Sequence, residues 1–86
     1  MKIEYTKEDA NFIERSYRDM VYNMKHPPKG KPCSDRVVKY VEWAMFHTLS
    51  ICGVKFTALG NGGAFRVFAP DGNDFPEDAK ESGGAV

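Results

Sequence analysis

The sequence has few of the features by which an activity is usually recognised. It has 86 residues with only two cysteines and one tryptophan, and no apolar run approaches the roughly 18 residues of a membrane-spanning helix. The first nine residues contain no apolar segment typical of a signal peptide, so we expect a cytoplasmic protein with no membrane partner. A chain of this length predicts one domain, with little room for a cofactor cleft beside its core, and we expect no cofactor.

Motifs for catalysis or nucleotide binding are also missing. Cys33 or Ser34 as a nucleophile would need a base and an oxyanion hole, and no glycine-rich elbow surrounds either residue. The glycine-rich segment Gly60–Gly63 lies between two expected strands rather than before a helix. That position fits a hairpin turn with residues at positive φ better than a phosphate-binding loop. We therefore expect a protein without enzymatic activity.

The cysteines and histidines lack the spacing of a metal site. Cys33 and Cys52 stand at the two ends of an expected helix, about 28 Å apart at 1.5 Å per residue, which is too far for a disulfide. His26 and His47 would complete a zinc set by residue type, but no pair has the close Cys-x-x-Cys arrangement. We expect no metal and two free thiols, which suit a reducing cytosol, with Cys52 buried and Cys33 in a linker.

The net charge of zero conceals two regions of opposite charge. Residues 1–70 hold 11 Lys/Arg against 7 Asp/Glu, a net charge of +4, and residues 71–86 hold one lysine against five acidic residues, a net charge of −4. The last sixteen residues are rich in glycine and acid and have few large apolar side chains. We therefore expect a domain over residues 1–70 and a disordered acidic tail over residues 71–86. Phe75 is the exception, either folding back on the domain or docking into a partner.

The first helix is predicted over residues 7–25. Thr6 followed by Asp9 is typical of a helix N-terminus, and the residue before Pro27 is disfavoured in a helical conformation. The apolar residues between these signals recur at helical spacing and form one stripe. The residues of that stripe are Ala10, Ile13, Tyr17, Met20, Val21 and Met24.

The second helix is predicted over residues 35–52. Ser34 is a favourable N-cap, and Gly53 stands where a glycine commonly ends a helix. The apolar positions cover about half of the circumference at 100° per residue, which predicts the central element of the core. These positions are Val37, Val38, Tyr40, Val41, Ala44, Met45, Leu49, Ile51 and Cys52.

The remainder of the domain is predicted to be a β-sheet. Residues 54–59 and 64–69 have the composition of two strands, joined by the Gly60–Gly63 turn. Because a lone two-stranded sheet is marginal in water, residues 1–5, which alternate apolar and charged side chains, are expected to add a third strand. The predicted fold class is a small α+β domain of order β-α-α-β-β, with two helices packed on a short antiparallel sheet.

Basic residues gather around the linker between the two helices. They are Lys25, His26, Lys29, Lys31, Arg36 and Lys39, opposed only by Asp35. A flexible cationic segment beside a helix start binds phosphate or an acidic protein surface, but lysines in such a loop are often simply solvated. The sequence leaves both interpretations open.

Several aromatic residues lie outside the apolar stripes. Phe12 and Tyr22 point away from the stripe of the first helix, and Trp43 and Phe46 fall within the polar arc of the second. Exposed aromatics beside arginine are typical of interface hot spots, although Trp43 and Phe46 packing under the linker or tail would explain the pattern as well. The predicted contact residues are Arg36, Lys39, Trp43 and His47, with Phe12, Tyr22, Lys29 and Lys31 as second choices.

These observations favour a small protein-binding module. Compact proteins of this size without an export signal are common among phage and mobile-element products, so we expect an inhibitor that occludes a surface of a host or defence protein. A homodimer would bury the same aromatics. The alternative is a nucleic-acid-binding domain, because residues 34–69, a helix followed by a hairpin, resemble a winged helix with Lys55 and Arg66 in the wing. Against it stand the missing third helix and the modest positive charge.

Overall fold

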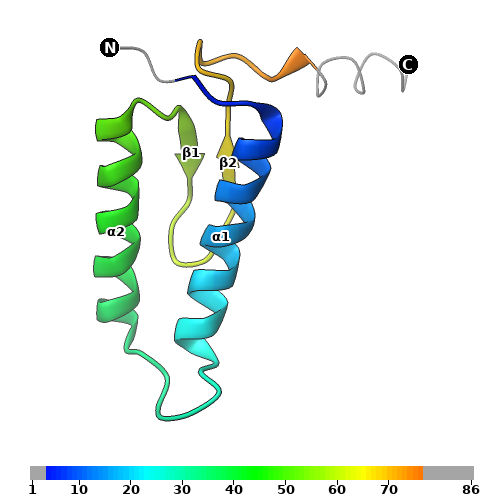
Figure 1. Ribbon diagram of the computed structural model, residues 1–86. Helices are drawn as coiled ribbons and strands as arrows, with labels where there is room; N and C mark the ends of the chain where they lie inside the picture. The colour runs from blue at the N-terminus through cyan, green and yellow to red at the C-terminus, as the bar shows by residue number, and fades with distance from the viewer. Residues whose placement is uncertain (1–3, 77–86) are drawn as a thin grey trace.

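The computed structural model describes residues 4–76. In chain order it contains α1 (Lys7–Lys25), α2 (Asp35–Cys52), β1 (Phe56–Ala58) and β2 (Phe65–Val67). The two helices run side by side along the hairpin, with the linker that joins them at one end of the domain and both ends of the described chain at the other (Figure 1). The predicted α+β fold, two helices packed on a short antiparallel sheet, is confirmed.

The bounds of α1 match the prediction because local signals set them. The Thr6 hydroxyl accepts a hydrogen bond from the Asp9 backbone N–H at 3.2 Å, and the Asp9 carboxylate accepts one from the Thr6 N–H at 2.9 Å. This capping box satisfies two of the backbone donors that a helix N-terminus leaves free. The helix ends at Lys25, with the C-cap His26 between it and the prolines, and it buries Ala10, Tyr17 and Val21.

The bounds of α2 also match, but its expected place at the centre of the core is wrong. The Ser34 hydroxyl accepts from the Val37 N–H at 3.3 Å, and Gly53 ends the helix with a left-handed φ of 89°. Only Val38 and Glu42 are buried on this helix. A hairpin of two short strands cannot cover half the circumference of a helix, so much of the apolar arc of α2 remains exposed to solvent. The expected core positions that are exposed are Val37, Tyr40, Ala44, Ile51 and Cys52.

The core consists of two adjoining clusters. One lies toward the open end of the hairpin and contains Ala10, Val54, Val67, Ala69 and Phe75. The other joins the two helices through Tyr17, Val21 and Val38, and Phe65 packs against both clusters.

Phe46 belongs to this core rather than to a contact surface. Its ring stacks on Phe65 with the centroids 5.8 Å apart and also meets the rings of Tyr17 and Phe56 at 5.6 and 5.4 Å. These contacts place Phe46 between α2 and the hairpin, half-buried. Of the two off-stripe aromatics on α2, Phe46 therefore packs inward, and Trp43 remains exposed.

The hairpin pairs Phe56 with Val67, and its turn has the predicted backbone conformation. Gly60, Asn61 and Gly62 have φ values of 79°, 56° and 79°. Such left-handed residues in succession reverse the chain without splaying the strands.

The expected third strand does not extend into the described residues. Residues 1–3 lie outside them, and Glu4 and Tyr5 belong to no strand. Tyr5 reaches the hairpin by its side chain instead: its hydroxyl donates to the Phe68 carbonyl at 2.5 Å and accepts from the Lys55 N–H at 3.1 Å.

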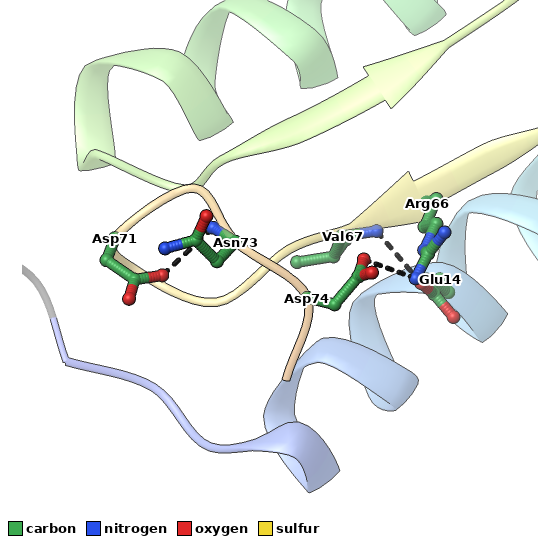
Figure 2. A network of polar contacts seen from close by, with 6 residues as sticks. All are labelled: Glu14, Arg66, Val67, Asp71, Asn73 and Asp74. Carbon is green, nitrogen blue, oxygen red and sulfur yellow. Dashed lines mark hydrogen bonds and ion pairs between the residues drawn. The ribbon is translucent and has the colours of Figure 1, made fainter. Parts of the chain in front are cut away.

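The first part of the expected disordered tail is folded onto the domain. Asp74 pairs with Arg66 at 2.5 Å, and the Asn73 N–H donates a hydrogen bond to the Asp71 carboxylate at 2.9 Å (Figure 2). Phe75 is buried, with its ring edge-on to Tyr5 at 6.1 Å, so it folds back on the domain. Residues 71–76 are therefore part of the domain, because one aromatic side chain and one ion pair hold them. The remaining tail, residues 77–86, lies outside the described residues.

A glutamate on α1 protects the outer edge of the sheet. The Glu14 carboxylate accepts a hydrogen bond from the backbone N–H of Val67 at 2.8 Å (Figure 2). Val67 lies opposite Phe56 in a pair whose own N–H groups point away from the partner strand, so this donor would otherwise be free. Covering an unpaired strand edge removes a template for pairing with another chain.

Neither helix in residues 4–76 combines the length and apolar character needed to cross a membrane.

Candidate functional site

The predicted contact strip of α2 lines an open groove between this helix and the tip of the hairpin. Arg36, Lys39 and Trp43 all line it, and its volume is about 770 Å³. The opposite wall comes from the hairpin turn, where Leu59 is exposed over 82% of its surface. His47, the fourth predicted residue of the strip, is exposed but is not among the residues that line the groove.

Aromatic and cationic side chains lie together on the rim of the groove. Trp43 is exposed over 58% of its surface, which answers the question that the sequence left open for this residue. The Lys39 ammonium lies 5.7 Å from the centroid of the Trp43 ring, and the Tyr40 ring lies 6.1 Å away on the same helix. A cation over an aromatic face limits the orientations of both side chains, so less entropy is lost when a partner contacts them.

The wall of the groove is held in place by the buried Glu42. Only 2% of the surface of Glu42 is exposed, and its carboxylate accepts hydrogen bonds from the N–H groups of Asn61 and Gly62 at 2.9 and 3.3 Å. The Tyr17 hydroxyl donates to the same carboxylate and accepts from the Gly62 N–H at 3.1 Å. Glu42 therefore ties α2, α1 and the hairpin turn together at one point.

The environment of Tyr17 shifts its acid–base behaviour. Burial raises the pKa of Tyr17 to about 12, and the hydrogen bond to the Glu42 carboxylate adds to this shift because the phenolate would face a second negative charge. The bond from the Gly62 N–H acts in the opposite direction but is weaker than the other two causes. The phenol is therefore neutral at physiological pH and serves as a hydrogen-bond donor.

The Glu42 carboxylate is fully engaged by donors of the protein itself. Both oxygens of this carboxylate are engaged by protein donors, so neither is free to take a proton from a substrate. The Ser34 hydroxyl caps α2, and the Cys33 thiol is free and exposed. Within residues 4–76, no group of three or more histidine, cysteine or acidic side chains is placed to hold a metal ion.

The second-choice contact residues lie elsewhere on the surface. The Tyr22 ring packs on His26 at 4.7 Å beside a shallow depression of about 250 Å³ on α1, and Phe12 lies under the guanidinium of Arg15 at 5.7 Å. Lys29 and Lys31 are exposed in the linker. None of the four lines the α2 groove, so the structure does not unite them with the strip.

Apart from Arg36, Lys39 and Trp43, the residues that line the groove were not predicted as contact residues. Tyr40 was assigned to the core stripe and Leu59 to a strand, and Glu42 was not singled out at all. The signal for Glu42 was its place one turn after Val38, within the buried stripe of α2, since an acidic residue there needs several donors. The glycine-rich turn supplies them through its backbone.

Comparison with known protein families, curated proteins and solved structures finds no match for this chain. The assignment of a function therefore depends on the chemistry of the groove.

Proposed function

We propose that this chain is a non-enzymatic protein-binding module that acts by covering a surface of its partner, and that the α2 groove is its contact site. The observation that supports the proposal most directly is the exposure of Trp43 and Leu59 on opposite walls of one groove, with Arg36 on its rim. Tryptophan and arginine are the side chains most enriched at interface hot spots, and large exposed apolar side chains mark places where a partner excludes water.

The charge of the groove favours a partner with acidic groups around an apolar centre. Arg36, Lys39 and the exposed Asp35 line it from α2, which leaves one positive charge in excess, and the Glu42 carboxylate is engaged in internal hydrogen bonds. In its more specific form, the proposal is that the chain is a phage or mobile-element protein that occludes a host or defence protein in the cytoplasm. The two exposed free thiols suit a reducing compartment.

The test is partner capture with matched aromatic variants. Trp43→Ala is expected to weaken partner binding by about 2 kcal/mol or more, roughly 30-fold, with the fold retained. Tyr22→Ala, which removes an equally exposed aromatic outside the groove, is expected to leave binding unchanged. Circular dichroism and urea unfolding control for folding. Recovery of no stoichiometric partner, or equal loss of binding in both variants, would contradict the proposal.

The alternative is a nucleic-acid-binding domain, which the cationic Arg36 and Lys39 beside the hairpin favour. Titration with DNA and RNA at low salt separates the two functions. Affinity that falls steeply with salt across many sequences supports the alternative, and absence of binding at low salt rejects it.

A further inference from the structure

The two outer edges of the hairpin are not equally covered. β2 lies beside α1, and β1 lies on the side of α2 (Figure 1). On the edge of β2, the Glu14 carboxylate occupies the outward N–H of Val67. Within residues 4–76, no group forms a hydrogen bond with the outward backbone groups of β1. The protection of the sheet edge is therefore one-sided.

The hydrogen-bond register shows which backbone groups the edge of β1 presents. The Phe68 N–H donates to the Lys55 carbonyl at 2.8 Å, so these two residues form a bonded pair. Because bonded and unbonded pairs alternate along an antiparallel ladder, the N–H and C=O groups of Phe56 and Ala58 point away from β2. The Phe56 ring meets Phe46 at 5.4 Å, so α2 packs on the face of the sheet and leaves the edge of β1 open.

Open space lies at both ends of this edge. The groove begins at Leu59, the residue directly after β1, and Phe46 lines it from α2. A second hollow of about 460 Å³ lies at the start of β1, where Phe56 and Thr57 line it together with Ser50 of α2. Ser50 follows Phe46 by one turn of the helix, so the two hollows lie between the same side of α2 and the same strand.

We infer that an extended segment of the partner protein adds to the sheet as a third strand along the outer edge of β1. The inference names the partner chemistry of the binding module and so rests on the proposed function. The outward N–H and C=O groups of Phe56 and Ala58 have the spacing of a strand and are matched by another extended backbone. A sheet of two strands is marginal in water, so a third strand stabilises it. The continuation of the segment beyond Ala58 enters the groove at Leu59.

The side chains of β1 specify the segment further. Lys55 and Leu59 are exposed and lie on the uncovered face of the sheet, because side chains alternate along a strand and Phe56 faces the helices. Opposite charges and apolar side chains form the favourable cross-strand pairs. The segment is therefore expected to carry an acidic residue beside Lys55 and an apolar residue beside Leu59. Residues 54–59 contain no acidic residue, so a second copy of β1 would leave Lys55 without a counter-charge.

Peptide selection followed by amide exchange tests the inference. Random linear peptides displayed on phage are selected against the full chain, and the strongest binder is synthesised as the probe. NMR-detected exchange of the Phe56 and Ala58 amides is expected to slow at least ~10-fold when this peptide saturates the protein. The exposed linker amide of Lys31 is the control and is expected to exchange at an unchanged rate.

A pair of variants at one position provides the second measurement. Ala58→Pro removes the outward N–H without breaking a bond to β2 and is expected to weaken binding of the peptide at least ~10-fold. Ala58→Ser keeps that N–H and is expected to bind as the wild type does. Circular dichroism controls for folding, and the exchange measurement on the wild type decides the question if Ala58→Pro does not fold.

Three results overturn the inference. The first is a peptide that binds without slowing exchange at Phe56 and Ala58, which leaves the groove as the contact site. The second is the absence of any selected peptide. The third is slow exchange of both amides in the chain alone, because the edge is then occupied by a second copy if the protection rises with concentration, and by the chain itself if it does not. The proposed function fails separately, through equal loss of partner binding in Trp43→Ala and Tyr22→Ala.

Discussion

The two helices differ in how their composition relates to their burial. α1 is the more polar helix, yet it buries Ala10, Tyr17 and Val21 and makes most of the helix contacts with β2. α2 is the more apolar helix, yet it buries only Val38 and Glu42 and leaves large apolar side chains in contact with solvent. In this domain, the more apolar helix is therefore not the helix that contributes more to the core. The surplus apolar surface of α2 is available for contact with other molecules.

Truncation of one tyrosine on each helix tests this division of roles most directly. Tyr17→Ala on α1 removes a fully buried ring and is expected to cost about 3–5 kcal/mol of unfolding free energy, enough to unfold a domain of this size. Tyr40→Ala on α2 removes a ring of the same chemistry that is mostly in solvent and is expected to cost under about 1 kcal/mol. Urea unfolding measures both, and equal costs would contradict the division of roles between the helices.

The pH dependence of stability tests the environment of Tyr17, where the two helices meet. The folded pKa of Tyr17, about 12, lies above the ordinary value of 10, so folding favours the neutral phenol. The stabilisation is complete below pH 10 and is lost as the pH rises from 10 to 12, by about 2–3 kcal/mol in all. Unfolding free energies measured across this range check the slope.

The matched control for that slope is Tyr17→Phe. This variant keeps the ring in place and has no phenol to ionise, so its stability is expected to change less steeply between pH 10 and 12. All other ionisable groups are common to the two proteins, so their contributions cancel in the difference. Parallel curves for the two proteins would show that Tyr17 ionises as readily in the folded state as in the unfolded state.

Two glutamates accept hydrogen bonds from the hairpin, and their substitutions are expected to lower the unfolding free energy by smaller and unequal amounts. Glu42→Gln on α2 puts an amide among three donors and is expected to cost about 1–3 kcal/mol, because one backbone N–H of the turn loses its acceptor. Glu14→Gln on α1 retains an oxygen for the single Val67 N–H and is expected to cost under about 1 kcal/mol. Thermal unfolding of the two variants measures the difference, and a reversed order would show that the strand edge matters more than the turn.

Local signals account for the part of the fold that the sequence predicts well. Thr6, Ser34 and Gly53 act within one turn of the helix ends, so both helices have the predicted bounds. The left-handed turn at Asn61 likewise follows from residue types at the turn itself. Each of these features depends on neighbours in the sequence, which is why one sequence suffices to predict it.

The features that the sequence does not predict depend on distant residues. Burial of Glu42 requires the N–H groups of a turn about twenty residues away, and burial of Phe75 requires Tyr5, seventy residues earlier in the chain. The exposure of Tyr40 likewise depends on how few strands the sheet contains, a property of the whole domain. Of the candidate site, Arg36, Lys39 and Trp43 were predicted because their helical spacing alone places them on one arc. The hairpin wall was not predicted.

The contact between Tyr5 and Phe75 has a consequence for the topology of the polypeptide. These residues lie near the two ends of the described chain, and their ring centroids are 6.1 Å apart. Both ends of the described chain lie at the end of the domain opposite the α1–α2 linker (Figure 1). The domain is therefore suited to circular permutation, with the old ends joined and new ends opened at the exposed Lys29–Gly30 bond. The domain is equally suited to insertion into a surface loop of a host scaffold. Because its two ends lie close together, the insertion would move the two sides of that loop apart very little.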